Sequence, residues 1–296
     1  MRTLIEIKNL SKSYDKKKDV LIDLTATIAD ATVFGLVGIN GAGKSTLLRL
    51  IAGVMRGDRG QVCVDGEDVY ENERAKKQIF FLPDDPYYTS NVTAQGLADL
   101  YRATYDFDNT AFFAYLEKFS LDSKAPIRNF SKGMKRQVFV ALALAVKPKY
   151  LLLDEAFDGL DPLARLVLKK ALVELVESKG STIIISSHSL RELEDICDSY
   201  GILDMGSITS SGDLGNDLQK VYKFQVAFDR EMTPEQLGVE YMSAEKTGRV
   251  IRFIIKGNKE EILAKIRALN PLFVEEIDVD FEELFIGEVQ ARGYLK

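Results

Sequence analysis

Residues 38–45 read GINGAGKS and match the phosphate-binding loop pattern, in which two glycines with four residues between them are followed by Lys and a hydroxyl residue. Glycines permit backbone turns that are closed to other residues, so several backbone N–H groups can converge on phosphate oxygens. Lys44 supplies a positive charge, and the Ser45 hydroxyl is a ligand for magnesium. The pattern therefore predicts binding of a nucleoside triphosphate with Mg²⁺. The residues expected at the nucleotide are Gly38, Asn40, Gly41, Ala42, Gly43, Lys44, Ser45 and Thr46.

The segments on both sides of this loop fit the same interpretation. Residues 32–37 (TVFGLV) form an apolar run of strand length, and residues 45–51 (STLLRLI) have helical apolar spacing. A strand, a glycine-rich turn and a helix would aim the partial positive charge of the helix N-terminus at the phosphates. The alternative is a glycine-rich connection in a sheet enzyme that binds no nucleotide, and these flanks disfavour it.

Charge and cysteine content limit the partners and the compartment. The chain has 39 Lys and Arg against 45 Asp and Glu, a net charge of −6, so we expect no nucleic-acid partner. Cys63 and Cys197 have no metal-ligand spacing and are expected to be reduced and buried, as in a cytosolic protein. No stretch approaches the roughly 18 apolar residues of a membrane span, and no secretion signal opens the chain. We therefore expect a soluble chain whose link to a membrane needs a partner.

Apolar periodicity predicts the fold class. Residues 150–153 and 181–186 are continuously apolar strands that alternate with helical segments, which indicates a parallel sheet covered on both faces. Residues 3–14 and 21–28 are expected to pair as antiparallel strands, and a helical subdomain is expected at about 90–148. The prediction is an α/β P-loop NTPase with a mainly parallel sheet, an N-terminal antiparallel β-subdomain, a helical subdomain and a small C-terminal α+β module.

The composition becomes small and polar at residues 206–216, where we place a boundary. An ATP-binding domain is expected at 1–215 and an accessory domain at 216–296. The second domain is predicted to be an α+β module, a split βαβ unit, with no catalytic constellation. Its expected elements are strands at 221–228, 250–256 and 272–279, a helix at 259–269, and a last helical turn in FEELFIGEV.

Two acidic residues end the strand YLLLDE at 150–155. Successive strand side chains point to opposite faces, so Asp154 and Glu155 are expected to have separate duties. Asp154 would hold magnesium through its water shell, and Glu155 would face the attacking water as the general base. The alternative for this acidic pair is a surface turn, which the phosphate loop disfavours.

His188 is the single histidine and directly follows the apolar strand IIISS. Carboxyl ends of parallel strands meet at one edge of a sheet, where phosphate loops also lie. We therefore expect the imidazole to contact the γ-phosphate or to orient the attacking water, a catalytic role.

Residues 130–137 (FSKGMKRQ) resemble the signature motif of ABC-type ATPases, whose commonest form is LSGGQ. Ser131 and Gly133 match that form. The segment AFDGLDP at 156–162 resembles the one that crosses between subunits in this family, and the resemblance covers residues 1 to about 215. The departures from the common signature resemble the subfamily that drives ABC-2-type exporters, and they are Phe130, Lys132 and Met134.

The resemblance implies a cofactor, partners and a location. ATP and Mg²⁺ would bind between two copies of the chain paired head to tail, each phosphate loop being closed by Ser131 and Gly133 of the other copy. Tyr14 would stack on adenine. The chain would then be the ATP-hydrolysing subunit of an exporter, held at the cytoplasmic face of the cell membrane by a separately encoded transmembrane permease.

Two other classes of protein fit the sequence less well. Soluble ABC ATPases that act on a ribosome or DNA commonly carry two fused ATPase domains, or a coiled-coil insertion and basic arms, whereas this chain has one phosphate loop and an acidic balance. A small GTPase would carry Asn-Lys-x-Asp, and the segment 258–261, Asn-Lys-Glu-Glu, is a poor counterpart outside the expected nucleotide domain.

The segment LPDDPYY at 82–88 departs from the family pattern. Asp84 occupies the position of a glutamine that usually touches magnesium, and the shorter Asp84 would reach the metal only through water while adding negative charge near Asp154. The alternative is that Asp84 and Asp85 cap the following turn. Tyr87 and Tyr88 are hypothesised to dock the membrane subunit, or else to cap the core of the helical block.

Overall fold

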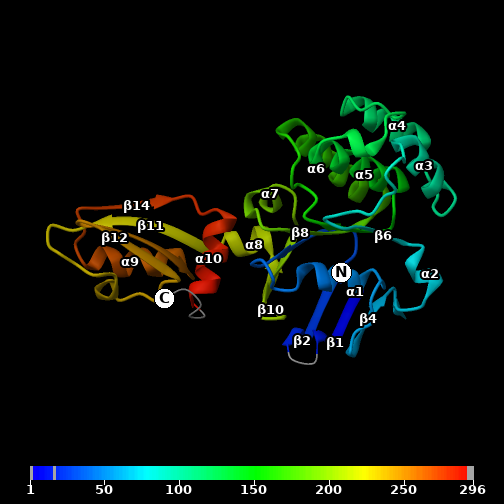
Figure 1. The fold of residues 1–296 in the computed structure, drawn as a ribbon. Coiled ribbons are helices and arrows are strands. Elements are labelled where there is room, and N and C mark those ends of the chain that lie inside the picture. The colour runs from blue at the N-terminus through cyan, green and yellow to red at the C-terminus, as the bar shows by residue number, and fades with distance from the viewer. Residues whose placement is uncertain (1–2, 16–17, 292–296) are drawn as a thin grey trace. The chain divides into compact units, whose positions relative to one another are not determined.

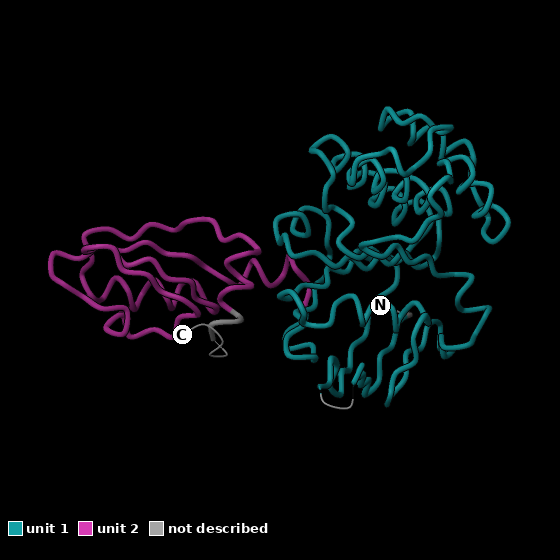
Figure 2. The backbone as a smooth tube through the Cα atoms, viewed as in Figure 1, with its two compact units in different colours: residues 1–211 teal, residues 212–296 magenta. Residues whose placement is uncertain are grey.

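A computed structural model describes residues 3–15 and 18–291 of the chain. The backbone forms two compact units, residues 1–211 and 212–296, drawn in separate colours in Figure 2. This division falls a few residues before the boundary expected from composition. No helix within the described ranges is both long and apolar enough to cross a membrane.

The central sheet of the first unit has six strands in the order β10-β9-β3-β8-β7-β6. Its β3–β8, β3–β9, β6–β7 and β7–β8 pairs are parallel, which confirms the mainly parallel sheet. Strands β3 and β7 are buried at every residue, as continuously apolar strands must be. The strands are β3 (Val33–Val37), β6 (Ile79–Leu82), β7 (Tyr150–Asp154), β8 (Thr182–Ser187), β9 (Ser199–Asp204) and β10 (Ser207–Asp213).

Helix α1 (Lys44–Ile51) covers one face of this sheet, whereas α5 (Lys132–Val146) and α6 (Pro162–Lys179) cover the other, as Figure 1 shows. A second sheet, of order β2-β1-β4-β5, packs on α1 from its far side through one shared apolar core. Its β1 and β2 are antiparallel, as expected. Burial between two sheets fixes α1 and the loop before it. The strands are β1 (Thr3–Asp15), β2 (Lys18–Ala29), β4 (Arg59–Val64) and β5 (Glu67–Asp68).

The helical subdomain consists of α3 (Ala94–Arg102), α4 (Asn109–Lys118) and α5. Each begins at a side chain that accepts a hydrogen bond from a backbone N–H of the first turn, and these caps are Thr93, Asp108 and Ser131. Short helices α2 (Glu73–Lys76), η1 (Ile127–Asn129) and α7 (Leu190–Glu194) connect the remaining parts of the unit.

The second unit is built on an antiparallel sheet of order β12-β13-β11-β14. Both β13 and β14 are antiparallel to β11, which lies between them, so they are parallel to each other and joined by α9. This is the expected split βαβ unit. The elements are α8 (Leu214–Leu218), β11 (Val221–Ala227), η2 (Pro234–Leu237), β12 (Ser243–Thr247), β13 (Val250–Lys256), α9 (Lys259–Ala268), β14 (Phe273–Ile277) and α10 (Phe281–Ala291).

Four strands, β5, β9, β10 and β12, were not expected from the sequence. The segment chosen as a boundary for its polar composition contains β10, which is the edge strand of the central sheet. Strand β12 is also at an edge and is intermediate or exposed at every residue. Edge strands that bury neither face need no apolar pattern, so composition alone does not reveal them.

Candidate nucleotide site

The loop between β3 and α1 has the geometry of a phosphate cradle. Gly43 lies at the start of α1 with a φ of 109°, in a region that favours glycine, and no side chain caps this helix. The first backbone N–H groups of α1 are therefore left to an external acceptor, which the helix dipole prefers to be an anion.

Lys44 lies inside this loop and is only 6% exposed. Its Nζ donates to the Gly38 carbonyl oxygen at 2.7 Å and lies 3.7 Å from Glu155 Oε1. The ammonium group is thus fixed between the loop and the end of β7. That position suits a single positive charge meant for a phosphate group.

Asp154 and Glu155 occupy different environments, as expected, but for a different reason. Strand β7 ends at Asp154, which is buried, and Glu155 has a left-handed φ of 49°, so the chain turns between the two residues. Asp154 Oδ1 accepts a hydrogen bond from Ser186 Oγ at 2.7 Å. The turn, and not strand alternation, separates the two carboxylates.

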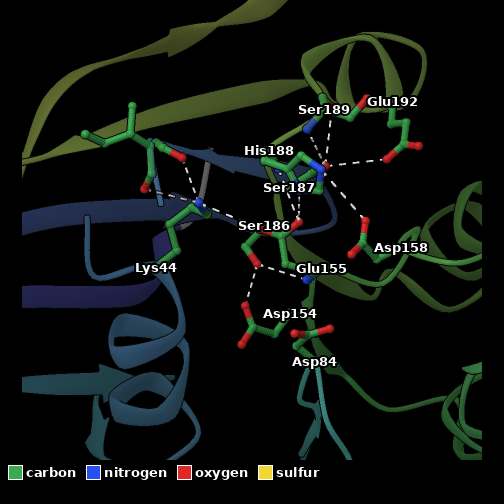
Figure 3. A network of polar contacts seen from close by, with 12 residues as sticks. Lys44, Asp84, Asp154, Glu155, Asp158, Ser186, Ser187, His188, Ser189 and Glu192 are labelled. Carbon is green, nitrogen blue, oxygen red and sulfur yellow. Dashed lines mark hydrogen bonds and ion pairs between the residues drawn. The ribbon is translucent and has the colours of Figure 1, made fainter. Parts of the chain in front are cut away.

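The Glu155 carboxylate also contacts His188, as Figure 3 shows. His188 Nδ1 lies 2.9 Å from Glu155 Oε2, and the His188 backbone N–H donates to the same oxygen at 3.2 Å. The hydrogen bond to Glu155 raises the pKa of His188 above its ordinary value. Lys44, Glu155 and His188 therefore form one continuous polar group at the carboxyl edge of the sheet.

A further ion pair, which was not predicted from the sequence, connects α6 to α7, the helix that follows His188. Buried Glu192 on α7 pairs with Arg165 on α6, and Arg165 Nε donates to the Leu160 carbonyl oxygen at 2.9 Å. Burial raises the pKa of Glu192. The pair connects the segment 156–162 to the helix that follows His188. The one sequence feature that could have indicated this ion pair is that both residues flank predicted motifs.

Ser131 and Gly133 lie at the start of α5. The Ser131 side chain is exposed, and its Oγ accepts a hydrogen bond from the Met134 backbone N–H at 3.2 Å. A Cβ atom at Gly133 would lie 2.4 Å from the Gly159 carbonyl oxygen. Only glycine permits this approach, which packs the signature segment directly against residues 156–162.

Tyr14 lies beside the phosphate loop with 58% of its surface exposed. Its hydroxyl is 3.1 Å from Thr46 Oγ1 and 3.6 Å from Met55 Sδ. The structure therefore brings Tyr14 to the first turn of α1, and leaves much of its surface open to solvent.

Asp84 is paired with a residue that the sequence did not suggest. Its Oδ1 lies 2.5 Å from Nη2 of Arg136, a buried arginine on α5. Tyr87 and Tyr88 differ from each other. Tyr87 is 91% exposed, whereas the Tyr88 ring contacts Phe139 with a centroid distance of 6.1 Å.

The oxygen donors at this edge fit magnesium. Ser45 lies in the first turn of α1 and Asp154 ends β7, and Mg²⁺ prefers such oxygen ligands together with phosphate oxygens and water. Within the described ranges, no group of three or more His, Cys, Asp and Glu side chains forms a cage for a metal.

The sequence is similar to known ATP-binding proteins of transporters. The family model described as ABC transporter matches residues 21–158. The ABC transporter ATP-binding protein YtrB of Bacillus subtilis is 31% identical over 98% of this chain and 99% of its own length. The lantibiotic transport ATP-binding protein SrtF of Streptococcus pyogenes is 30% identical over 77% of this chain and 99% of its own.

Solved structures resemble about three quarters of this chain. An ATP-binding subunit of an ABC transporter is 32% identical, with a TM-score of 0.67, over 73% of this chain and 92% of that one. CbiO1 from Clostridium perfringens is described as part of the transporter complex cbiONQ. It has a TM-score of 0.61 at 24% identity and covers 73% of this chain and 90% of its own. The second likeness shows the fold alone.

Proposed function

This chain belongs to the ABC transporter ATP-binding proteins and is an ATPase coupled to transport, and from this premise we propose that it powers export through a separately encoded membrane subunit. The names of several relatives support the direction. SrtF serves lantibiotic transport, LptB of Haemophilus influenzae belongs to a lipopolysaccharide export system, and LnrL of Bacillus subtilis confers linearmycin resistance.

In the proposed reaction, Glu155 is the general base for the attacking water. Its carboxylate is held between Lys44 and His188, so it cannot rotate freely away from the phosphate cradle. Lys44 binds the triphosphate and balances the charge of Glu155. Bound Mg²⁺, held by Ser45 and Asp154, would neutralise charge on the phosphate oxygens. His188 orients the Glu155 carboxylate and lies ready to contact the γ-phosphate or the water.

We further propose that ATP closes a head-to-tail dimer of two copies. Ser131 is exposed and Gly133 is partly exposed at the start of α5, so a partner's nucleotide can approach both. Tyr14 would stack on adenine, using the part of its surface that is open to solvent. Closure on ATP and reopening after hydrolysis would pass movement to the membrane subunit.

Tyr87 is the better candidate for docking the membrane subunit. It is nearly fully exposed, whereas Tyr88 packs on Phe139 and stabilises the helical block. An exposed aromatic side chain is a common anchor of protein interfaces. Docking there would hold the chain at the cytoplasmic face of the membrane.

The contact of Glu155 with both Lys44 and His188 carries the proposed mechanism, and Glu155→Gln tests it. The amide retains the size of the side chain but cannot accept a proton, so hydrolysis should slow by about 10²-fold while ATP still binds. Turnover of radiolabelled ATP measures hydrolysis, and a nucleotide-binding assay measures ATP affinity. Size-exclusion chromatography with ATP measures formation of the dimer. Near-normal turnover with retained binding would show that another group activates the water.

A further inference from the structure

The ion pair of Asp84 and Arg136 connects two segments that lie 52 residues apart in the chain. Asp84 belongs to the loop that follows β6, and Arg136 belongs to the second turn of α5, the helix that begins with the signature residues. Arg136 also donates to the Pro83 carbonyl oxygen at 3.0 Å and to the Asp84 carbonyl oxygen at 2.6 Å. One side chain thus holds both the backbone and the carboxylate of this loop.

The guanidinium group of Arg136 needs a negative partner. Arg136 is only 3% exposed, whereas Asp84 is 50% exposed at its side chain. An uncompensated charge that is removed from water is costly, and backbone carbonyl groups supply only partial charges. The Asp84 carboxylate therefore compensates the buried charge of Arg136.

The carboxylate equally needs a positive partner because of where it lies. In the parallel register of β6 and β7, Leu82 is opposite Leu153, so Pro83 and Asp84 follow β6 at the edge where Asp154 ends β7. Figure 3 shows Asp84 on the Asp154 side of that edge. A second free carboxylate there would repel both Asp154 and a triphosphate held by Lys44.

We propose that Arg136 is a positioning residue that cancels the charge of Asp84, so that the two side chains together present a neutral polar group to the nucleotide. The inference rests on the proposed location of the triphosphate at this edge. It explains how the chain carries an aspartate where the family pattern predicts an uncharged glutamine. The two side chains then act as a unit. Removal of both charges should weaken ATP binding less than removal of the Arg136 charge alone.

Three variants of the full-length chain test the unit: Arg136→Gln, Asp84→Asn and the double variant. Arg136→Gln leaves Asp84 as a free negative charge, so we expect ATP affinity to fall by roughly tenfold, the scale of about 1.4 kcal/mol. Asp84→Asn should not weaken ATP binding but should lower Tm, because Arg136 stays buried without its counter-charge. The double variant should bind ATP within about threefold of the wild type.

Magnesium gives a second readout that a merely structural role of Arg136 would not change. A free Asp84 carboxylate repels ATP without magnesium more strongly than Mg²⁺·ATP, because the metal removes two negative charges from the nucleotide. Arg136→Gln should therefore weaken ATP binding in EDTA more than in excess Mg²⁺. Binding of a fluorescent ATP analogue in both buffers measures this ratio, and Tm without nucleotide establishes that each variant is folded.

Two further variants serve as controls. Arg136→Lys retains the charge and should bind ATP nearly as the wild type does, which keeps the inference testable if Arg136→Gln does not fold. Arg102→Gln breaks an exposed Arg–Asp pair on α3 and should change neither affinity nor the magnesium ratio.

The inference is overturned if the double variant loses as much affinity as Arg136→Gln, or if the loss is equal with and without magnesium. Failure of the proposed site would look different, because Lys44→Ala would then leave ATP affinity unchanged in the same assay. If Lys44→Ala weakens ATP binding, but the double variant does not regain affinity or the magnesium dependence is absent, only the proposed role of Arg136 is wrong.

Discussion

The two compact units place their charged side chains in different ways. In the first unit, Lys44 and Asp154 are buried at the carboxyl edge of the parallel sheet, where Lys44 pairs with Glu155 and Asp154 accepts a hydrogen bond from Ser186. In the second unit, the ion pair of Lys259 and Glu276 is exposed at both side chains and joins α9 to β14. The difference follows from topology. Parallel strands bring all their carboxyl ends to one edge, whereas antiparallel strands divide them between two.

This comparison indicates that hydrolysis belongs to the first unit and that the second serves another purpose. We propose that the second unit stabilises the dimer or regulates it. Its apolar core, formed between the sheet and α9, is separate from the core shared by α1 and the two sheets of the first unit.

The largest effect is expected at the buried charge of the first unit. Lys44→Ala should weaken ATP binding by at least about tenfold, because a charge-assisted hydrogen bond to phosphate is lost. Equilibrium titration with ATP and Mg²⁺ measures the change. Lys149→Ala is the matched control, since Lys149 precedes β7 at the opposite edge of the sheet and pairs with Asp65. Equal losses of ATP affinity in both variants would show that the buried Lys44 is no more important for binding than the exposed Lys149.

A smaller effect is expected from removal of the second unit. A chain that ends at residue 218 retains β10 and α8, and should bind ATP within about twofold of the full-length chain because no residue of the site is lost. Its dimer with ATP should dissociate more readily than that of the full-length chain. Analytical ultracentrifugation of the two chains, both carrying Glu155→Gln, would show the difference. A loss of ATP affinity comparable to that of Lys44→Ala would mean that the second unit contributes to the site.

The smallest effect concerns the protonation of His188. Because its pKa is raised in the folded state by Glu155, the pair stabilises the fold below the unfolded pKa of about 6.5 and loses this contribution as pH rises through the folded pKa. The imidazole is half exposed, so solvent screening limits the change to on the order of 1 °C in Tm.

Calorimetry of the wild type and of His188→Gln between pH 5.5 and 8.5 separates this contribution. The difference in Tm between the two proteins should shrink as pH rises. His188 is the single histidine, so a difference that is constant with pH would show that packing, and not charge, is responsible.

Much of the fold was predictable because strong local patterns marked its interior. The strands β3, β7 and β8 are buried at every residue and have apolar centres, and the helices of the first unit have regular periodicity. The edge strands β10 and β12 were missed because they bury little surface. The turn at Glu155 was also missed, since a left-handed residue other than glycine has no clear sequence signal.

The phosphate loop can be located from the sequence alone, because its N–H groups, its ammonium group and its hydroxyl are supplied by neighbouring residues whose geometry is local. The carboxylate and the imidazole that follow the core strands can be located in the same way. The charge partners are visible only in the folded chain, since Arg136 reaches Asp84 and Arg165 reaches Glu192 across separate elements. Which distant side chains meet depends on strand order and helix packing, and neither is encoded in any short segment of the chain.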